Sequence, residues 1–155
     1  MSFGFPPSRP LVASATAVLL LSGAGTAWAA SSKQVNASGT VKLHHREPAT
    51  KKIEQRGSVR GTPFGSGSLT LRSKLAARKK LAFSVRFSTR AGAVVGSGTA
   101  TVSTSGSRSS FRGTLRITGG SGRYRGISRS TLTVSGSGDS SSRSTTVRFS
   151  GRVRY

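Results

Sequence analysis

Apolar residues recur at every second position through much of the chain, and this pattern restricts the fold more than any other feature of the sequence. The clearest run is residues 81–88, in which Leu81, Phe83, Val85 and Phe87 alternate with small or polar side chains. Successive side chains of a β-strand point to opposite faces, so such a run predicts a strand with one buried face. After residue 30, no apolar pattern keeps a helical period for three turns. The sequence therefore predicts an all-β fold.

Clusters of Gly and Ser separate these runs, as turns between short strands require. The 155 residues are enough for one domain. We expect an antiparallel β-barrel or, alternatively, a β-sandwich, because periodicity alone does not separate the two. The expected strands lie near residues 41–45, 69–75, 81–88, 98–104, 111–117, 132–134 and 147–155.

The stretch 113–128 (GTLRITGGSGRYRGIS) combines a strand with a sharp corner. Leu115 and Ile117 alternate with polar residues, and three glycines then follow before Tyr124. Glycine permits left-handed backbone and close chain approach, so the cluster predicts a tight corner between two strands. Tyr124 is expected to anchor that corner in the core.

The N-terminal residues have the layout of a secretory signal peptide. A weakly basic start with Arg9 precedes the apolar run 11–21, and Ala27-Trp28-Ala29 supplies small residues at the two key positions of a cleavage site. We expect residues 1–29 to be a signal peptide, 30–57 a lead-in with weak N-terminal strands, and 58–155 the barrel core. This predicts a secreted, extracellular or cell-envelope protein without a membrane span after cleavage.

The charge is strongly one-sided, with 25 Lys and Arg against 3 acidic residues and a net charge of +22. Such a surface favours anionic partners: nucleic acid, anionic cell-wall polymers, anionic lipid surfaces or acidic polysaccharide. The chain has no cysteine, which excludes disulfides, thiolate zinc sites and a cysteine nucleophile.

Three segments carry a family resemblance: 61–67 (GTPFGSG), 113–126 (GTLRITGGSGRYRG) and 151–155 (GRVRY). Together they resemble small secreted bacterial proteins of the allene oxide cyclase and dirigent barrel-like type, which share a glycine-rich corner ending in an aromatic residue. The resemblance implies an antiparallel barrel of about eight strands with an interior large enough for a small apolar ligand. Plant enzymes of this type use polar and acidic pocket residues, and these have no counterpart here, so no activity is implied.

Basic residues fall on the polar phase of most expected strands and in several turns, which predicts basic rows on the outer face. One interpretation is electrostatic docking on polyanions without base readout. The other is a solvated surface whose charges keep strand edges from aggregating. The candidate polyanion-binding residues are Arg72, Arg78, Lys79, Lys80, Arg86, Arg112, Arg116, Arg123, Arg125, Arg148, Arg152 and Arg154.

Other constellations suggest chemistry less directly. His44, His45 and Glu47 form the one cluster of acid–base type, but neighbouring residues of a strand point to opposite faces, which disfavours chelation of one ion. A ribonuclease scheme would combine one histidine with Glu54 and an arginine. The segment 119–123 is a structural turn rather than a phosphate loop because no helix is expected after it, although its backbone amides could form an anion nest.

These observations predict an exported, non-enzymatic binding or structural protein that docks on polyanions through a cationic surface. The alternative is a small apolar-ligand carrier, or a cyclase-like or dirigent-like protein, that uses the barrel interior around Phe83, Phe87 and Tyr124. No metal or cofactor is expected in either case, and the sequence leaves the oligomeric state open.

Overall fold

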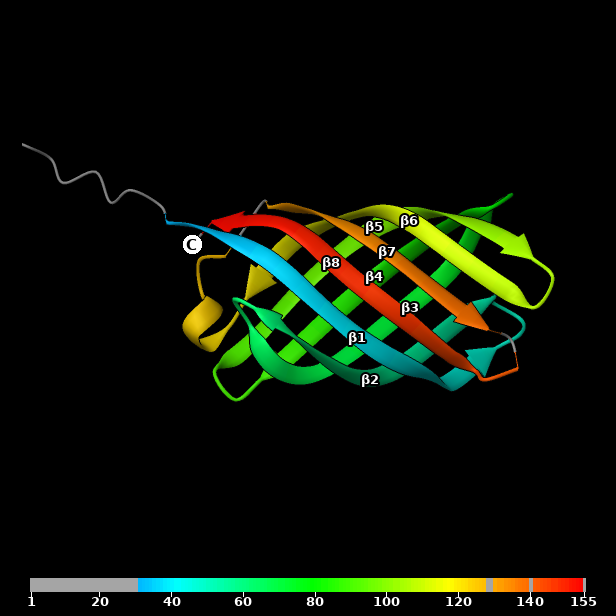
Figure 1. Ribbon diagram of the computed structural model, residues 1–155, viewed down its shortest axis with the longest axis horizontal. Coiled ribbons are helices and arrows are strands. Elements are labelled where there is room, and N and C mark those ends of the chain that lie inside the picture. The colour runs from blue at the N-terminus through cyan, green and yellow to red at the C-terminus, as the bar shows by residue number, and fades with distance from the viewer. Residues whose placement is uncertain (1–30, 128–129, 140, 155) are drawn as a thin grey trace, which may run out of the picture.

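The computed structural model describes residues 31–127, 130–139 and 141–154, and these form a closed eight-stranded antiparallel β-barrel. Each strand pairs with its neighbours in the sequence, and β8 pairs with β1 to close the barrel (Figure 1). The fold class predicted from the sequence is confirmed, and the barrel rather than the sandwich is correct. The elements are β1 (Ser32–Glu47), β2 (Lys52–Thr62), β3 (Gly65–Ala77), β4 (Lys80–Thr89), β5 (Gly92–Ser105), β6 (Arg108–Gly120), the 3₁₀ helix η1 (Gly122–Tyr124), β7 (Thr131–Asp139) and β8 (Ser144–Arg154).

The period-two pattern places apolar side chains inside the barrel and polar ones outside. On β8, Val147, Phe149 and Val153 are buried, whereas Arg148 and Arg152 between them are exposed. The same alternation on all eight strands produces one continuous apolar core. Burial of this core is the main source of stability, because the chain has no disulfide.

The N-terminal part of the barrel differs from expectation. Residues 30–57 were expected to be a lead-in with weak N-terminal strands, but β1 begins at Ser32 and pairs along its length with both β2 and β8. Val35 and Val41 are fully buried, so the barrel begins at Ser32 rather than at residue 58. The inward positions between the two valines are Ala37 and Gly39, which are too small to give a strong hydrophobic signal. The expected signal peptide at 1–29 lies outside the described residues.

Two further boundaries are corrected. The segment 51–59, which falls in none of the expected strands, lies largely in β2, and the gap expected between residues 134 and 147 is shorter because β7 continues to Asp139. Glycines at inward positions weaken the sequence signal on both strands. On β2, a Cβ at Gly57 would collide with the carbonyl oxygen of Thr40 and lie 2.7 Å from the Cα of Val41. Glycine is required there because β1 and β2 approach closely where the sheet bends.

One end of the barrel is closed by its own side chains. We call it the plugged end: it carries the β2–β3 turn, the β4–β5 turn and η1, at the left of Figure 1. The Phe64 ring packs edge-to-face against Phe87 (centroids 5.4 Å apart) and Tyr124 (5.5 Å apart). The Tyr124 hydroxyl donates a hydrogen bond to the Phe64 carbonyl oxygen at 3.2 Å. The corner expected after Ile117 is therefore confirmed, with Tyr124 as its buried anchor.

The opposite end, which we call the open end, carries the β1–β2, β3–β4, β5–β6 and β7–β8 turns, at the right of Figure 1. Its inward-facing side chains are not covered by a plug. Leu43 and Leu75 are 36% and 46% exposed there. Apolar side chains are thus covered at the plugged end and partly exposed to solvent at the open end.

Candidate polyanion-binding surface

The strands β6 and β8 place a group of arginines on the outer face of the barrel. All five are exposed, because each alternates with an inward-facing core residue on its strand. We call this group the arginine face: Arg112, Arg116, Arg148, Arg152 and Arg154.

The strand register orders these arginines in rows. Arg112 on β6 lies opposite Ser135 on β7, and Ser135 lies opposite Arg148 on β8. Arg116 on β6 lies opposite Thr131 on β7. Neighbouring strands are ~4.8 Å apart, so arginines two strands apart are separated by ~10 Å at the backbone, and those four residues apart on one strand by ~13 Å. Hydroxyl side chains stand between the positive charges and add hydrogen-bond donors to the surface.

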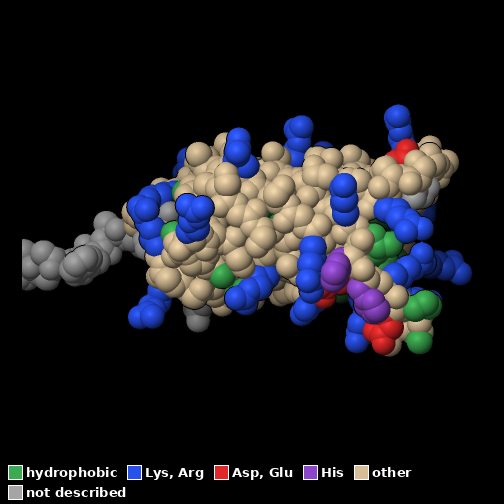
Figure 2. Space-filling model, turned by 90° about the horizontal axis from the view of Figure 1, so that it is seen from below, with side chains coloured by type: hydrophobic (Ala, Val, Ile, Leu, Met, Phe, Trp, Pro, Cys, Tyr) green, Lys and Arg blue, Asp and Glu red, His purple; other side chains and the backbone are tan. Residues whose placement is uncertain are grey.

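The arginine face has no acidic counterpart. Among the described residues, ion pairs occur only at Glu47 and Glu54, which lie on β1 and β2. On the arginine face, Arg152 donates a hydrogen bond of 3.4 Å to the side-chain oxygen of Gln34, a neutral partner. On the face that Figure 2 shows, which is the underside of Figure 1, Lys and Arg side chains lie along the whole length of the barrel and acidic side chains at a few places only. The positive charge is therefore available to an external anion.

The other predicted basic residues lie elsewhere. Arg86 is exposed on β4. Arg72 is not free, because its Nε donates to Glu54 Oε2 at 2.8 Å. The remaining candidates divide between the two ends: Arg78, Lys79 and Lys80 at the β3–β4 turn of the open end, and Arg123 and Arg125 at η1 of the plugged end.

Several exposed basic residues lie outside the predicted set, including Arg56 and Arg60 on β2. Their alternation with Gly57 and Val59 was a usable signal, but the apolar phase of this strand is weak. Arg56 and Arg72 together hold Glu54, with Arg56 Nε donating to Oε1 at 2.7 Å. The hydrogen bonds from Arg72 and then Arg56 keep the pKa of this carboxyl below its usual range.

The two arginine hydrogen bonds to Glu54 disfavour the role that the ribonuclease scheme gives to this carboxylate. Both Glu54 oxygens already accept arginine hydrogen bonds, and the lowered pKa makes the carboxylate a weak proton acceptor. His44 and His45 are exposed beside a bulge between β1 and β2. In the described part of the chain, no three His, Cys, Asp or Glu side chains are grouped to hold a metal ion.

The anion nest suggested for the corner after β6 is not available either. The backbone amides of Ser121, Arg123, Tyr124 and Arg125 all donate to backbone carbonyl oxygens. Two of these acceptors, at residues 91 and 93, belong to the β4–β5 turn and β5, so the bonds hold η1 onto the barrel. The segment 119–125 is a structural corner.

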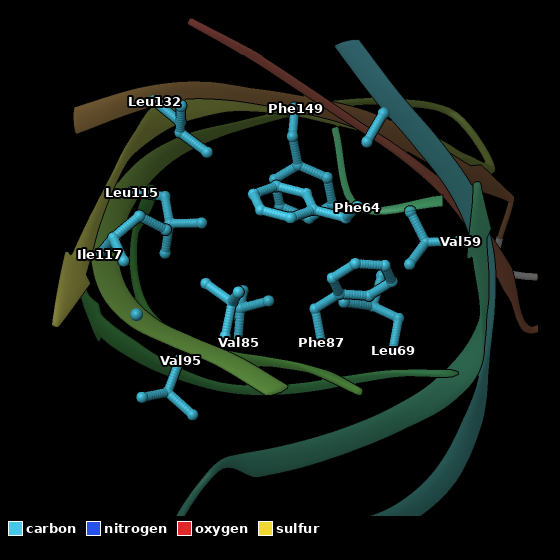
Figure 3. A pocket seen from close by; sticks show the side chains of 13 residues that line it. Val59, Phe64, Leu69, Val85, Phe87, Val95, Leu115, Ile117, Leu132 and Phe149 are labelled. Carbon is cyan, nitrogen blue, oxygen red and sulfur yellow. The ribbon is translucent and has the colours of Figure 1, made fainter. Parts of the chain in front are cut away.

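The barrel interior holds a small apolar cavity of about 30 Å³, lined in part by Phe87, Leu115 and Phe149 (Figure 3). That volume accommodates about one water molecule, whereas ligand pockets measure ~300–1,000 Å³. Phe83 and Phe87 are buried members of the core, and Tyr124 belongs to the plug. The part of the interior around Phe87, Leu115 and Phe149 is thus filled by side chains, whereas Phe83 also lines a larger hollow of about 560 Å³ that opens to the surface.

Fold and surface together define a closed eight-stranded up-and-down barrel with an apolar core and an arginine-rich exterior. Comparisons of the chain with protein-family models, with curated proteins and with solved structures found no match. The described part of the chain contains no helix of the length and hydrophobicity that crossing a membrane requires.

Proposed function

We propose that this chain is an exported, non-enzymatic protein that docks on anionic polymers through the arginine face. The observation that carries the proposal is the row structure of five exposed arginines on β6 and β8, none of which is neutralised by a described carboxylate. Export rests on the signal-peptide layout of residues 1–29.

The composition of the surface favours recognition of charge over recognition of bases. Serine and threonine hydroxyls between the arginines can donate to phosphate or carboxylate oxygens, as phosphate contacts in nucleic-acid complexes do. Most aromatic rings of the described residues are buried and cannot stack on bases, as at Phe83, Phe87 and Phe149. Binding should therefore depend on the anion's charge density and little on its sequence.

The test is a titration of the chain with duplex DNA, a glycerol-phosphate polymer and a neutral glycan at several salt concentrations. We expect binding to both anions, none to the glycan, and a linear fall of log K with log salt whose slope is about −0.9 per phosphate neutralised on DNA. The variant R112Q/R116Q/R148Q/R152Q should flatten that slope by about 3.6 if each arginine neutralises one phosphate.

The control variant R86Q/R90Q/R123Q/R125Q removes the same charge from β4 and the plugged end. It should keep most of the slope, because these residues lie outside the arginine face. Equal losses in both variants would mean that net charge alone drives binding and that the arginine face has no special role. No binding of either anion at low salt would refute the proposal.

A further inference from the structure

We propose that the open end of the barrel docks on the surface of an anionic lipid bilayer. This inference concerns a different surface and a different partner from the arginine face, and it does not depend on that proposal. It rests on three observations at the open end: an uncovered apolar rim, an excess of basic residues, and the conformation of the turns.

The apolar rim consists of one residue near the open end of each of six successive strands, β1 to β6. Leu43 and Leu75 are the two large hydrophobic residues that are exposed in the described part of the chain, and the others are half-buried. At the plugged end, the equivalent apolar side chains are covered. Exposed apolar side chains that gather in one place mark an interaction site. The rim residues are Leu43, Ile53, Leu75, Leu81, Val102 and Phe111.

Basic residues surround this rim. The segments 46–52, 74–80, 105–108 and 139–144 contain nine Lys and Arg residues and two acids, Glu47 and Asp139. Both acids have local partners, since Glu47 accepts a hydrogen bond from Thr50 and Asp139 accepts one from Ser141. Figure 2 shows hydrophobic side chains among Lys and Arg side chains at its right-hand end. The basic residues are Arg46, Lys51, Lys52, Lys74, Arg78, Lys79, Lys80, Arg108 and Arg143.

The turns of the open end hold basic residues in a backbone conformation that favours glycine. Lys51, Lys79 and Arg143 have φ values of 54°, 59° and 50°, one in each of three turns. Side-chain-bearing residues other than Asn and Asp rarely adopt this left-handed conformation. The fourth turn, and the corresponding places at the plugged end, use glycine: Gly106, Gly65, Gly122 and Gly126. A basic side chain thus stands at three turn tips where the backbone alone would favour glycine.

An anionic bilayer matches this combination better than the other anionic partners do. Leucine side chains such as Leu43 and Leu75 can leave water for the acyl-chain boundary, while the long Lys and Arg side chains reach the headgroups above them. Anionic headgroups attract basic residues near the membrane surface. A nucleic acid or a polar polysaccharide offers no apolar layer for the rim. The geometry therefore points to a lipid surface, with the open end of the barrel facing the bilayer.

The test is co-sedimentation with vesicles of phosphatidylcholine alone or mixed with phosphatidylglycerol. The unmodified chain should bind the mixed vesicles and not the neutral ones. K51G/K79G/R143G should bind roughly a hundredfold more weakly, at about fivefold for each basic residue removed. Its unfolding midpoint should not fall, because glycine accepts the left-handed conformation. L43S/L75S should also weaken binding by removing the apolar contact.

Two controls separate this site from others on the chain. The arginine-face variant R112Q/R116Q/R148Q/R152Q should keep vesicle binding, and the open-end variants should keep binding to DNA. The apolar run of residues 11–21 could bind vesicles by itself, so each measurement is repeated on chains that start at Ala30. These shorter chains keep all eight strands, which lie within residues 32–154.

Three outcomes would overturn the proposal. The first is equal binding to neutral and anionic vesicles, or binding to neither. The second is vesicle binding that neither open-end variant reduces. The third is binding that K51G/K79G/R143G loses but L43S/L75S retains in full, because the rim would then take no part and the contact would be purely electrostatic.

Discussion

The plugged end leads to a sharp prediction about Phe64, whose ring closes the barrel. Replacing it with alanine removes both of its edge-to-face contacts, with Phe87 and Tyr124. It also removes one of the side chains that line the small internal cavity. Phe64 is 8% exposed, although it belongs to a turn rather than a strand. Its side chain lines the cavity and, together with Tyr124, covers the apolar interior at this end.

The magnitude follows from the contacts. Truncation of a buried phenylalanine to alanine costs about 3–5 kcal/mol of unfolding free energy, and we expect Phe64→Ala to lie near ~3 because a turn can partly collapse into the gap. Each edge-to-face pair contributes ~0.5–1.5 kcal/mol beyond burial. Phe64→Leu keeps most of the apolar volume and loses both pairs, so at ~0.5–1 kcal/mol for each pair we expect a cost of about 1–2 kcal/mol, below that of Phe64→Ala.

The measurement is urea unfolding followed by far-ultraviolet circular dichroism, with unchanged m-values as the condition for comparing variants. Phe111→Ala serves as the control, because Phe111 is half-buried at the open end and should cost less. If Phe64→Ala lowers the free energy of unfolding no more than Phe111→Ala does, Phe64 does not have the closing role assigned to it. The closing role is also excluded if Phe64→Leu costs as much as Phe64→Ala, because the ring contacts would then carry the whole effect.

Two further predictions concern single polar contacts. Tyr124→Phe keeps the ring but leaves the Phe64 carbonyl oxygen without its hydroxyl donor, so we expect a loss of about 1–2 kcal/mol in the same urea assay. Glu54→Gln tests the pH dependence of stability. Because Arg72 and Arg56 lower the folded-state pKa of Glu54, its contribution is present above about pH 4.5 and is lost as the pH falls through the lowered value. Thermal unfolding midpoints between pH 2 and 7 should show a smaller acid-induced fall in Glu54→Gln than in the unmodified chain, and equal falls would contradict the assignment.

The strands with large inward residues could be predicted from the sequence, and those with small ones could not. Leu81, Phe83, Val85 and Phe87 mark β4 unambiguously. On β1, the inward positions between the two buried valines hold Ala37 and Gly39, so the pattern resembles a polar lead-in. Small residues are needed there because neighbouring strands approach closely where the sheet bends.

The arginine face could be predicted as separate basic stripes, but its assembly into rows depends on register. No feature of the sequence states that Arg112, Ser135 and Arg148 lie opposite one another. The pairing of Glu54 with Arg72 is likewise a contact between strands, which removes one predicted binding residue from the free set. Local patterns give the direction of a side chain, whereas partners across strands come from the turn lengths and shear of the closed barrel.

The topology of the barrel explains how its two ends can differ so strongly. In an up-and-down barrel, alternate turns lie at opposite ends, so the turns after β2, β4 and β6 can close the core without affecting those after β1, β3, β5 and β7. The first set contains Phe64 and Tyr124, which bury one another. The second set has basic residues at three of its turns and leaves the rim residues Leu43 and Leu75 exposed. A surface needed only for solubility would keep glycine at these turn positions, as the backbone favours, and would cover its leucines. The open end does neither, which is why we propose a docking role for it, whereas the plug closes the core at the other end.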